Sequence, residues 1–207
     1  LSIFKNINKL PPGTVLDVAY EKELFPELIS AYWSPSEPCK VGLQKLTPSN
    51  QQEVIQEMIE NSIISRLVAD VPVGVFLSGG IDSSLVAAVA AKYCHGSLKS
   101  FSIGFNEAGY DESKKAEAIA AHLGLEHTTK VMTSDDAKKV IPLLPQIWDE
   151  PFSDSSQIPT LLVSELAKKD VTVVLTGDGA DEVFGGYNRY GKGYDIFQSM
   201  ASMPNTV

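Results

Sequence analysis

Strand-like and helix-like segments alternate along most of this chain, and this alternation is the feature that most constrains its fold. Short apolar runs bounded by turn residues predict buried strands, and apolar residues recurring every three or four positions predict helices. The order predicts an α/β fold: an open, mostly parallel, twisted sheet with helices on both faces. The predicted elements are a strand at 73–77, a helix at 83–93, a strand at 98–105, a helix at 111–123, a short strand at 126–131, a helix beginning near residue 134, a helix at 156–169 and a strand at 171–176.

The first 47 residues have a different character. They contain five prolines and two hairpin-like stretches, "GTVLDVAY" and "LISAYW", which predict short β-strands preceding the α/β part. An amphipathic helix capped by Ser49 or Asn50 then runs to about Asp70. We therefore divide the chain into residues 1–47 and residues 48–207. The apolar positions of the amphipathic helix are Val54, Ile55, Met58, Ile59, Ile63 and Leu67.

Composition excludes several classes of protein. No apolar run approaches the roughly 20 residues that a membrane span requires, and the first residues lack the features of a signal peptide. The two cysteines, Cys39 and Cys94, form no zinc-binding or disulfide pattern, which fits a reducing compartment. A net charge of −9 gives no electrostatic footprint for a nucleic-acid backbone. We expect a cytoplasmic protein without a nucleic-acid or membrane partner.

The stretch "VFLSGGIDSS", residues 75–84, leaves a buried strand through residues suited to ligand binding rather than to packing. Ligands of open parallel sheets bind outside the carboxyl ends of the strands, where this stretch is predicted to lie. Gly79 and Gly80 allow a tight turn and a close approach of the backbone to a ligand. Ser83 and Ser84 place hydroxyls at a helix N-terminus, where unpaired amides and the helix dipole attract an anion such as phosphate.

Asp82 is unexpected in a phosphate-binding loop, because its carboxylate repels phosphate unless a divalent cation such as Mg²⁺ lies between them. A second apolar strand, "VTVVLTGDGADE", also ends in glycines and carboxylates. Taken singly, these residues are ordinary helix caps and turn residues. The combination of a strand, S-G-G-x-D-S-S and a helix favours a binding function. The lysine-containing Walker loop and the G-x-G-x-x-G dinucleotide pattern are both absent from the sequence.

The stretch "SGGIDSS" resembles the pyrophosphate-binding loop of the N-type ATP pyrophosphatases, which implies an adenine nucleotide alpha hydrolase-like fold. Three further motifs narrow the resemblance to the synthetase domain of glutamine-dependent asparagine synthetases. The motifs are "FSIGFNEAGYDESKKAEAIAAHLGLEH", "DEPFSDSSQIPT" and "LTGDGADEVFGGYNRY". The resemblance covers residues 46–194. Residues 1–47 resemble the last strands of the family's amino-terminal glutaminase domain.

The resemblance implies a role for each matching residue. Asp82 and Asp181 would bind magnesium. Asp178 would help to organise the adenylation step. The resemblance implies that all three are catalytic residues. The residues that would wrap the pyrophosphate portion of ATP are Ser78, Gly79, Gly80, Ile81, Asp82, Ser83 and Ser84. The remaining matches are Leu77 and Ile103 beside the adenine, and Thr176 and Gly177 near the ribose and the α-phosphate.

The same resemblance implies an amide-forming ligase that uses ATP and magnesium. The side-chain carboxylate of aspartate would attack the α-phosphorus, pyrophosphate would leave, and ammonia would displace AMP to give asparagine. Ammonia would come from glutamine through a glutaminase domain, and a homodimer is a candidate assembly. The catalytic cysteine and a later catalytic lysine of the family have no counterpart in the chain. We therefore expect a fragment with weak or absent synthetase activity that still binds ATP.

Two other functions stay open at this level. One is a related ligase with another carboxylate substrate, such as a β-lactam precursor or a sugar-linked acid. The other is a non-catalytic nucleotide-binding or subunit-interface module, which the presence of both Asp82 and Asp181 disfavours. Among residues with local roles, "YDESKK" predicts a capped helix start with a solvated face. His95, His122 and His127 lack metal-ligand spacing and are predicted to be surface or satisfied polar residues. The stretch 154–156 predicts a helix cap, and a part in an amino-acid pocket remains open.

Overall fold

The computed structural model describes residues 2–18, 29–34, 47, 49–94, 96–106 and 111–201. Within these residues the chain forms two compact units, one from Leu1–Met58 with Pro145–Ser153 and the other from Ile59–Leu144 with Asp154–Val207. Cys39, His95, Tyr110 and much of the proline-rich segment lie outside the described residues. No helix in the described ranges is long and apolar enough to cross a membrane.

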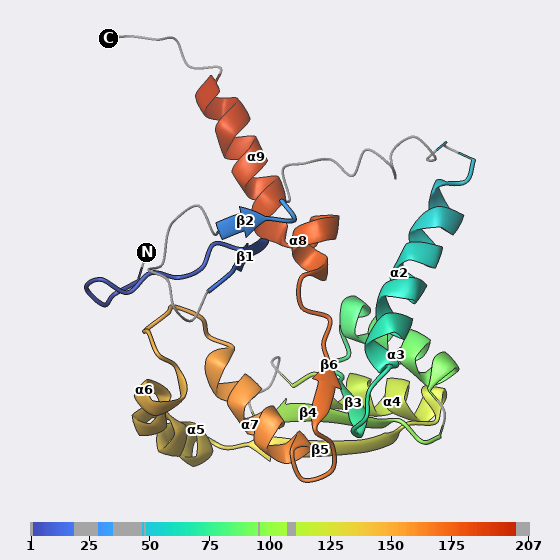
Figure 1. Cartoon of the computed structure of the whole chain (residues 1–207). Coiled ribbons are helices and arrows are strands. Elements are labelled where there is room, and N and C mark those ends of the chain that lie inside the picture. Colours follow the sequence, from blue (N-terminus) through green and yellow to red (C-terminus); the bar gives the residue numbers. More distant parts are fainter. Residues whose placement is uncertain are drawn as a thin grey trace. The chain divides into compact units, whose positions relative to one another are not determined.

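The first unit contains a small antiparallel ladder. Its strand β1 (Thr14–Leu16) pairs with β2 (Ile29–Ala31), as Figure 1 shows. This pairing confirms the short strands predicted for the N-terminal segment. Lys9 forms an ion pair with Glu150 at 3.0 Å, which links this segment to the 145–153 stretch of the same unit.

The second unit is built on a parallel sheet. Among its described residues, four strands lie in the order β5-β4-β3-β6, and every neighbouring pair is parallel. This arrangement confirms the predicted α/β fold class. The strands are β3 (Val73–Phe76), β4 (Lys99–Phe105), β5 (Glu126–Met132) and β6 (Val173–Leu175). The helices of the described residues are α2 (Gln51–Leu67), α3 (Ile81–Tyr93), α4 (Ser113–Leu123), α5 (Ser134–Val140), the 3₁₀ helix η2 (Ile141–Leu143), α6 (Leu144–Ile147), α7 (Gln157–Ala167), α8 (Ala180–Phe184) and α9 (Asn188–Ala201).

The strand order creates a switch point beside β3. From β3 the chain moves through β4 to β5 at one edge of the sheet, and it then returns to place β6 on the other side of β3. The register sets Val75 opposite Leu175, and Phe76 opposite Phe101. Strand ends on either side of a switch point diverge and leave a crevice for ligands. The loops after β3 and β6 therefore lie at the expected ligand-binding edge.

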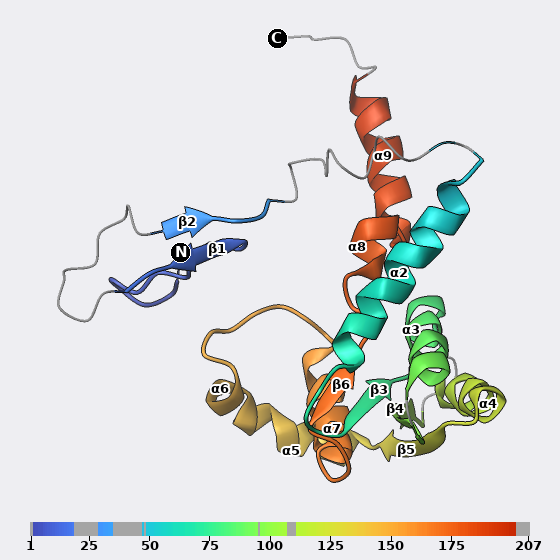
Figure 2. The same cartoon turned by 45° about the vertical axis from the view of Figure 1, so that its right-hand side comes forward.

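Alternating residues of β3 face opposite helical layers. Val75 is buried in a cluster formed with α2, α3 and α4, and Leu77 just after the strand belongs to the same cluster. Phe76 packs instead with Phe101 and with Val163 of α7. Figures 1 and 2 show α3 and α4 on one side of the sheet and α7 on the other. Helices on both faces are thus a consequence of the two-residue period of a buried strand.

Some helix boundaries differ from the predicted ones. Helix α3 begins at Ile81 rather than at residue 83, because the second glycine of the loop serves as its N-cap. Helix α4 begins at Ser113 rather than at residue 111. Asp111 precedes it, and hydrogen bonds from the Ser113 hydroxyl and from the Ser113 N–H, the latter at 3.1 Å, lower the pKa of Asp111. The helix starts within "YDESKK" as predicted, but its N-cap residue, Glu112, makes no side-chain capping hydrogen bond. The predicted apolar face of α2 is wrong at Met58, which is 60% exposed, whereas Ile63 is buried.

Helices α8 and α9 were not predicted, because glycines interrupt the sequence there. Gly185 ends α8 in a left-handed conformation with φ of 70°. Two glycines lie inside α9, where each lowers helix propensity by up to about 1 kcal/mol relative to alanine. The structure therefore shows two helices that local helix propensity did not predict.

A polar network lies within the sheet beside the apolar clusters. The His127 ring on β5 forms hydrogen bonds with Ser100 Oγ (2.8 Å), Ser102 Oγ (3.1 Å) and Thr129 Oγ1 (3.1 Å). Both serines are buried on β4. Every ring nitrogen of His127 thus has a partner, which confirms the predicted satisfied polar role.

The stability of this network should depend on pH. Burial lowers the pKa of His127 below its ordinary value of about 6.5, so the unfolded chain binds a proton more readily than the native chain. The free energy of unfolding should therefore fall as the pH decreases below about 6.5. Urea unfolding of the wild type at pH 7.5 and pH 5.5 should show this loss, and His127→Asn should show a smaller one. His122→Asn, at an exposed position of α4, serves as the control; equal losses in the wild type and His127→Asn would contradict the prediction.

Candidate functional site

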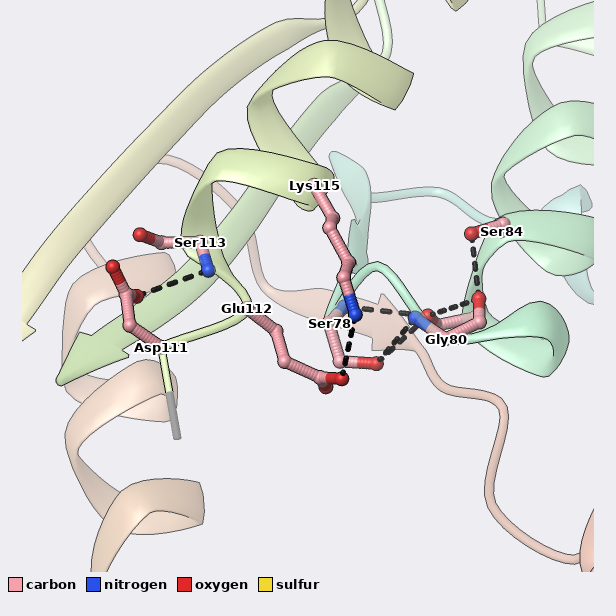
Figure 3. A network of polar contacts seen from close by, with 8 residues as sticks. Ser78, Gly80, Ser84, Asp111, Glu112, Ser113 and Lys115 are labelled. Carbon is pink, nitrogen blue, oxygen red and sulfur yellow. Dashed lines mark hydrogen bonds and ion pairs between the residues drawn. The ribbon is translucent and has the colours of Figure 1, made fainter. Parts of the chain in front are cut away.

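The loop after β3 is closed onto the start of α3 by its own serines. Ser78 N donates to Ser83 Oγ at 3.2 Å, and the two hydroxyl oxygens lie 3.0 Å apart. Gly80 N donates to Ser78 Oγ at 3.3 Å, as Figure 3 shows. Between them, Gly79 has a φ of 84°, a conformation that residues with a side chain rarely adopt. The loop is therefore a defined turn rather than an extended connection.

The hydroxyls of Ser83 and Ser84 hold the loop in this conformation. Both donate to the Gly80 carbonyl oxygen, at 3.3 Å and 2.6 Å respectively. The groups left to attract an anion are the first amides of α3, which have no acceptor within the helix. Gly80, the N-cap, has no side chain with which to cap them. The helix dipole adds partial positive charge at the same end.

The loop after β6 packs directly against this helix start. A Cβ added to Gly177 would lie 2.8 Å from Ser83 N and 3.0 Å from the carbonyl carbon of Asp82. No side chain fits there without displacing backbone. The two strand ends singled out from the sequence therefore meet, and a glycine is required at their contact.

A cavity of about 610 Å³ lies where the two loops meet. Its walls include five of the predicted site residues: Ile81 and Asp82 from the first loop, and Thr176, Gly177 and the predicted catalytic residue Asp178 from the second. Sequence reasoning missed the contribution of α2, whose residues carry no motif. It also did not assign Phe184 of α8 to the site, although this residue lies within "LTGDGADEVFGGYNRY". These additional lining residues include Ser62, Arg66 and Phe184.

A further cavity, of about 270 Å³, lies over β3, β4 and the start of α7. Leu77, Ser78 and Ile103 line it, so the structure brings together the two residues predicted to contact adenine. Its other walls are mostly apolar. Ser156 also lines this cavity and donates its N–H to Asp154 Oδ1 at 2.8 Å. Asp154 thus forms a turn just before α7. Ser156 is the N-cap of this helix but makes no side-chain capping hydrogen bond, so the predicted side-chain cap is absent there, and Ser156 lines a pocket.

Asp181 is not among the residues that line either cavity, although its neighbour Ala180 lines the larger one. It is in the first turn of α8, and its carbonyl accepts the Gly186 N–H at 3.0 Å. Among the described residues, no group of three or more histidine, cysteine, aspartate or glutamate side chains is arranged to hold a metal ion. A cation at this edge would need oxygen ligands from a bound substrate in addition to protein carboxylates. Phosphate oxygens are such ligands, and Mg²⁺ is usually bound in this way.

Comparison with known proteins agrees with this geometry. Residues 54–204 match the family model described as asparagine synthase. The chain is 37% identical over 186 residues to the glutamine-hydrolysing asparagine synthetase 1 of Bacillus subtilis (strain 168), covering 89% of this chain and 28% of the relative. It is 36% identical over 146 residues to the glutamine-hydrolysing asparagine synthetase of Asparagus officinalis, covering 65% and 24%.

Among solved structures, the NH₃-dependent NAD synthetase from Campylobacter jejuni aligns with a TM-score of 0.46 at 18% identity, over 66% of this chain and 60% of that one. The chain spans about a quarter of the length of the two synthetases above. The family match extends from α2 to the C-terminal helix and includes both loops of the site. The chain belongs to the asparagine synthase family.

Proposed function

We propose that the chain carries the ATP-binding part of an amide-forming ligase of the asparagine synthetase type. The enzyme would adenylate the side-chain carboxylate of aspartate, release pyrophosphate, and transfer ammonia to give asparagine and AMP. The observation that carries this proposal is the contact of Gly177 with the backbone of Asp82 and Ser83, which joins the two loops at one cavity. Membership of the asparagine synthase family supports the same reaction.

The two loops and the two cavities would divide the nucleotide between them. The backbone of Ser78–Ser84 would hold the pyrophosphate portion, because its amides and the α3 dipole provide fixed positive charge. Leu77 and Ile103 would contact the adenine in the smaller, mostly apolar cavity. Thr176 and Gly177 would lie beside the ribose and α-phosphate.

Asp82 and Asp181 would hold magnesium together with phosphate oxygens. Two protein carboxylates suit Mg²⁺, which is usually bound by one or two carboxylates, substrate phosphates and water. When bound, the ion would offset the negative charge that develops on the phosphate oxygens. Asp178 would organise the acid substrate in the larger cavity, whose largely apolar walls would keep water from the activated carboxyl group.

The remaining parts of the proposal concern the whole protein. Residues 1–47 would be the end of a glutaminase-type domain, and residues 48–207 the start of the synthetase domain. Glutamine hydrolysis in the former domain would supply the ammonia. The enzyme would act in the cytoplasm.

Asp82→Asn is expected to weaken magnesium-dependent ATP binding by about tenfold or more, since it removes the charge that a shared cation needs. Titration calorimetry with ATP, in the presence and absence of Mg²⁺, measures this effect. The fold should persist, because a carboxylate in a first helical turn contributes only about 0.3–1 kcal/mol through the dipole. Asp135→Asn is the matched control, with an acid in the first turn of α5. Unchanged magnesium dependence in Asp82→Asn would contradict the assigned role.

The acid substrate is tested by exchange of labelled pyrophosphate into ATP, which requires reversible adenylation. Assayed in the whole enzyme, aspartate should support exchange above other carboxylic acids in a panel that includes glutamate and β-amino acids. Exchange driven by another acid and not by aspartate would keep the adenylation chemistry and reassign the substrate.

A further inference from the structure

The two loops of the site carry negative charge, and the sequence around them contains no lysine or arginine to offset it. Neither residues 67–91 nor residues 172–188 contain a lysine or arginine, and the loops carry Asp82, Asp178 and Asp181. A polyphosphate brings further negative charge to the same edge. Amides and one divalent cation offset part of this charge, and many phosphate-binding loops add a lysine. Here a cation has to come from another element of the fold.

The first turn of α4 abuts the loop at its glycine turn. A Cβ added to Gly79 would lie 2.8 Å from Lys115 Cβ, 3.1 Å from Ala116 N and 3.3 Å from Glu112 O. The positive φ of Gly79 and the lack of a side chain allow this approach. The backbone at Lys115 therefore lies against the loop, although Lys115 is more than thirty residues away from Gly79 in the sequence.

The ammonium of Lys115 is only loosely held. Its Nζ lies 3.6 Å from Glu112 Oε1, and the side chains of this i,i+3 pair are 68% and 54% exposed. Exposed pairs of this kind exchange readily for a stronger partner. Figure 3 shows both side chains extending from α4 toward Ser78, and Glu112 lines the smaller cavity together with Ser78. The pair thus places an exposed, weakly paired positive charge beside the loop.

We propose that Lys115 is a phosphate-binding residue of this site, supplied by α4 in place of the lysine that the loop lacks. On nucleotide binding, the ammonium leaves Glu112 and pairs with oxygens of the β- or γ-phosphate. Glu112 holds the ammonium near the loop in the free protein and competes with the phosphate for it. The inference rests on the proposed nucleotide-binding function and adds a residue to it.

The test measures binding of inorganic pyrophosphate, Mg-ATP and adenosine to the 207-residue chain by calorimetry. Lys115→Gln should weaken pyrophosphate and ATP binding by about tenfold or more, with adenosine binding unchanged, because a charge-assisted contact to phosphate is lost. Lys115→Arg should retain most of the affinity. Glu112→Gln should tighten pyrophosphate binding by up to about fivefold, since it removes a competing exposed ion-pair partner. An opposite sign for the two members of one ion pair is a result that a purely structural role does not produce.

Two control variants remove a positive charge elsewhere. Lys114→Gln changes the neighbouring residue on the same helix turn, and Lys138→Gln breaks an exposed i,i+3 pair with Asp135 on α5. Both should bind pyrophosphate as the wild type does.

Arg66→Gln removes the cation that lines the larger cavity. If Arg66→Gln loses pyrophosphate affinity and Lys115→Gln does not, the loop's cation is Arg66 and the inference is overturned.

Failure of the inference is distinguishable from failure of the proposed function. Wild-type affinity for pyrophosphate in Lys115→Gln, with Asp82→Asn impaired, would overturn only the role of Lys115. If Glu112→Gln weakened pyrophosphate binding as much as Lys115→Gln does, the ion pair would only stabilise the local structure. That result would also overturn the role of Lys115 in phosphate binding. A wild-type chain that binds neither pyrophosphate nor ATP would remove the proposed nucleotide site itself.

Discussion

Gly177→Ala is expected to reduce ATP and pyrophosphate binding by at least about 100-fold. Its Cβ would lie 2.8 Å from Ser83 N and 3.0 Å from the Asp82 carbonyl carbon, so backbone atoms have to move apart. The movement displaces the first turn of α3, whose amides are the main anion-binding groups of the site. A misplacement of about 1 Å at a preorganised site can cost about 100-fold in reaction rate, and we expect a comparable loss of affinity when the binding amides are displaced. Overpacking should also lower the free energy of unfolding by about 1–3 kcal/mol.

Calorimetric titration and urea unfolding of the same samples measure the two effects of Gly177→Ala. Gly191→Ala is the matched control, because a Cβ at Gly191 has no neighbour within 4 Å. That substitution, inside α9, should leave binding unchanged and add up to about 1 kcal/mol of stability. Wild-type affinity in Gly177→Ala would mean that contact between the two loops is not needed for nucleotide binding.

Phe101→Ala is expected to lower the free energy of unfolding by about 3–5 kcal/mol. Phe101 is only 1% exposed and has the largest fully buried side chain among the described residues. It packs with Val163, Ala167 and Val171 between β4 and α7. A Cβ at Gly74 on the neighbouring strand would lie 3.0 Å from the Phe101 ring, so the ring fills space that a glycine leaves open. Alanine would leave a cavity that the sheet cannot close.

Urea unfolding followed by far-ultraviolet circular dichroism measures the effect of Phe101→Ala. Phe197→Ala on α9 removes the same side chain from a position that is 67% exposed, and should change stability by less than about 0.5 kcal/mol. Comparable losses in the two variants would contradict the central position of Phe101 in the core.

The candidate site was partly predictable from the sequence. Gly79, Gly80 and Asp82 were recognised because glycines, hydroxyls and a carboxylate at the end of an apolar strand serve binding better than packing. Arg66 and Lys115 were not recognised as neighbours of the loops. They belong to helical patterns in which a charged residue is ordinarily solvent-exposed, so only their position in space gives them meaning.

The sequence by itself determined the alternation of strands and helices, the parallel α/β class and the two ligand-binding strand ends. These features depend on local periodicity and on residues that act within a few positions of one another. Only the tertiary structure decided that β6 pairs with β3, that Gly177 touches Ser83, and that the first turn of α4 abuts Gly79. Such contacts join residues that are far apart in sequence. They are selected by burial of two apolar layers on one sheet, a property of the whole unit that no local pattern encodes.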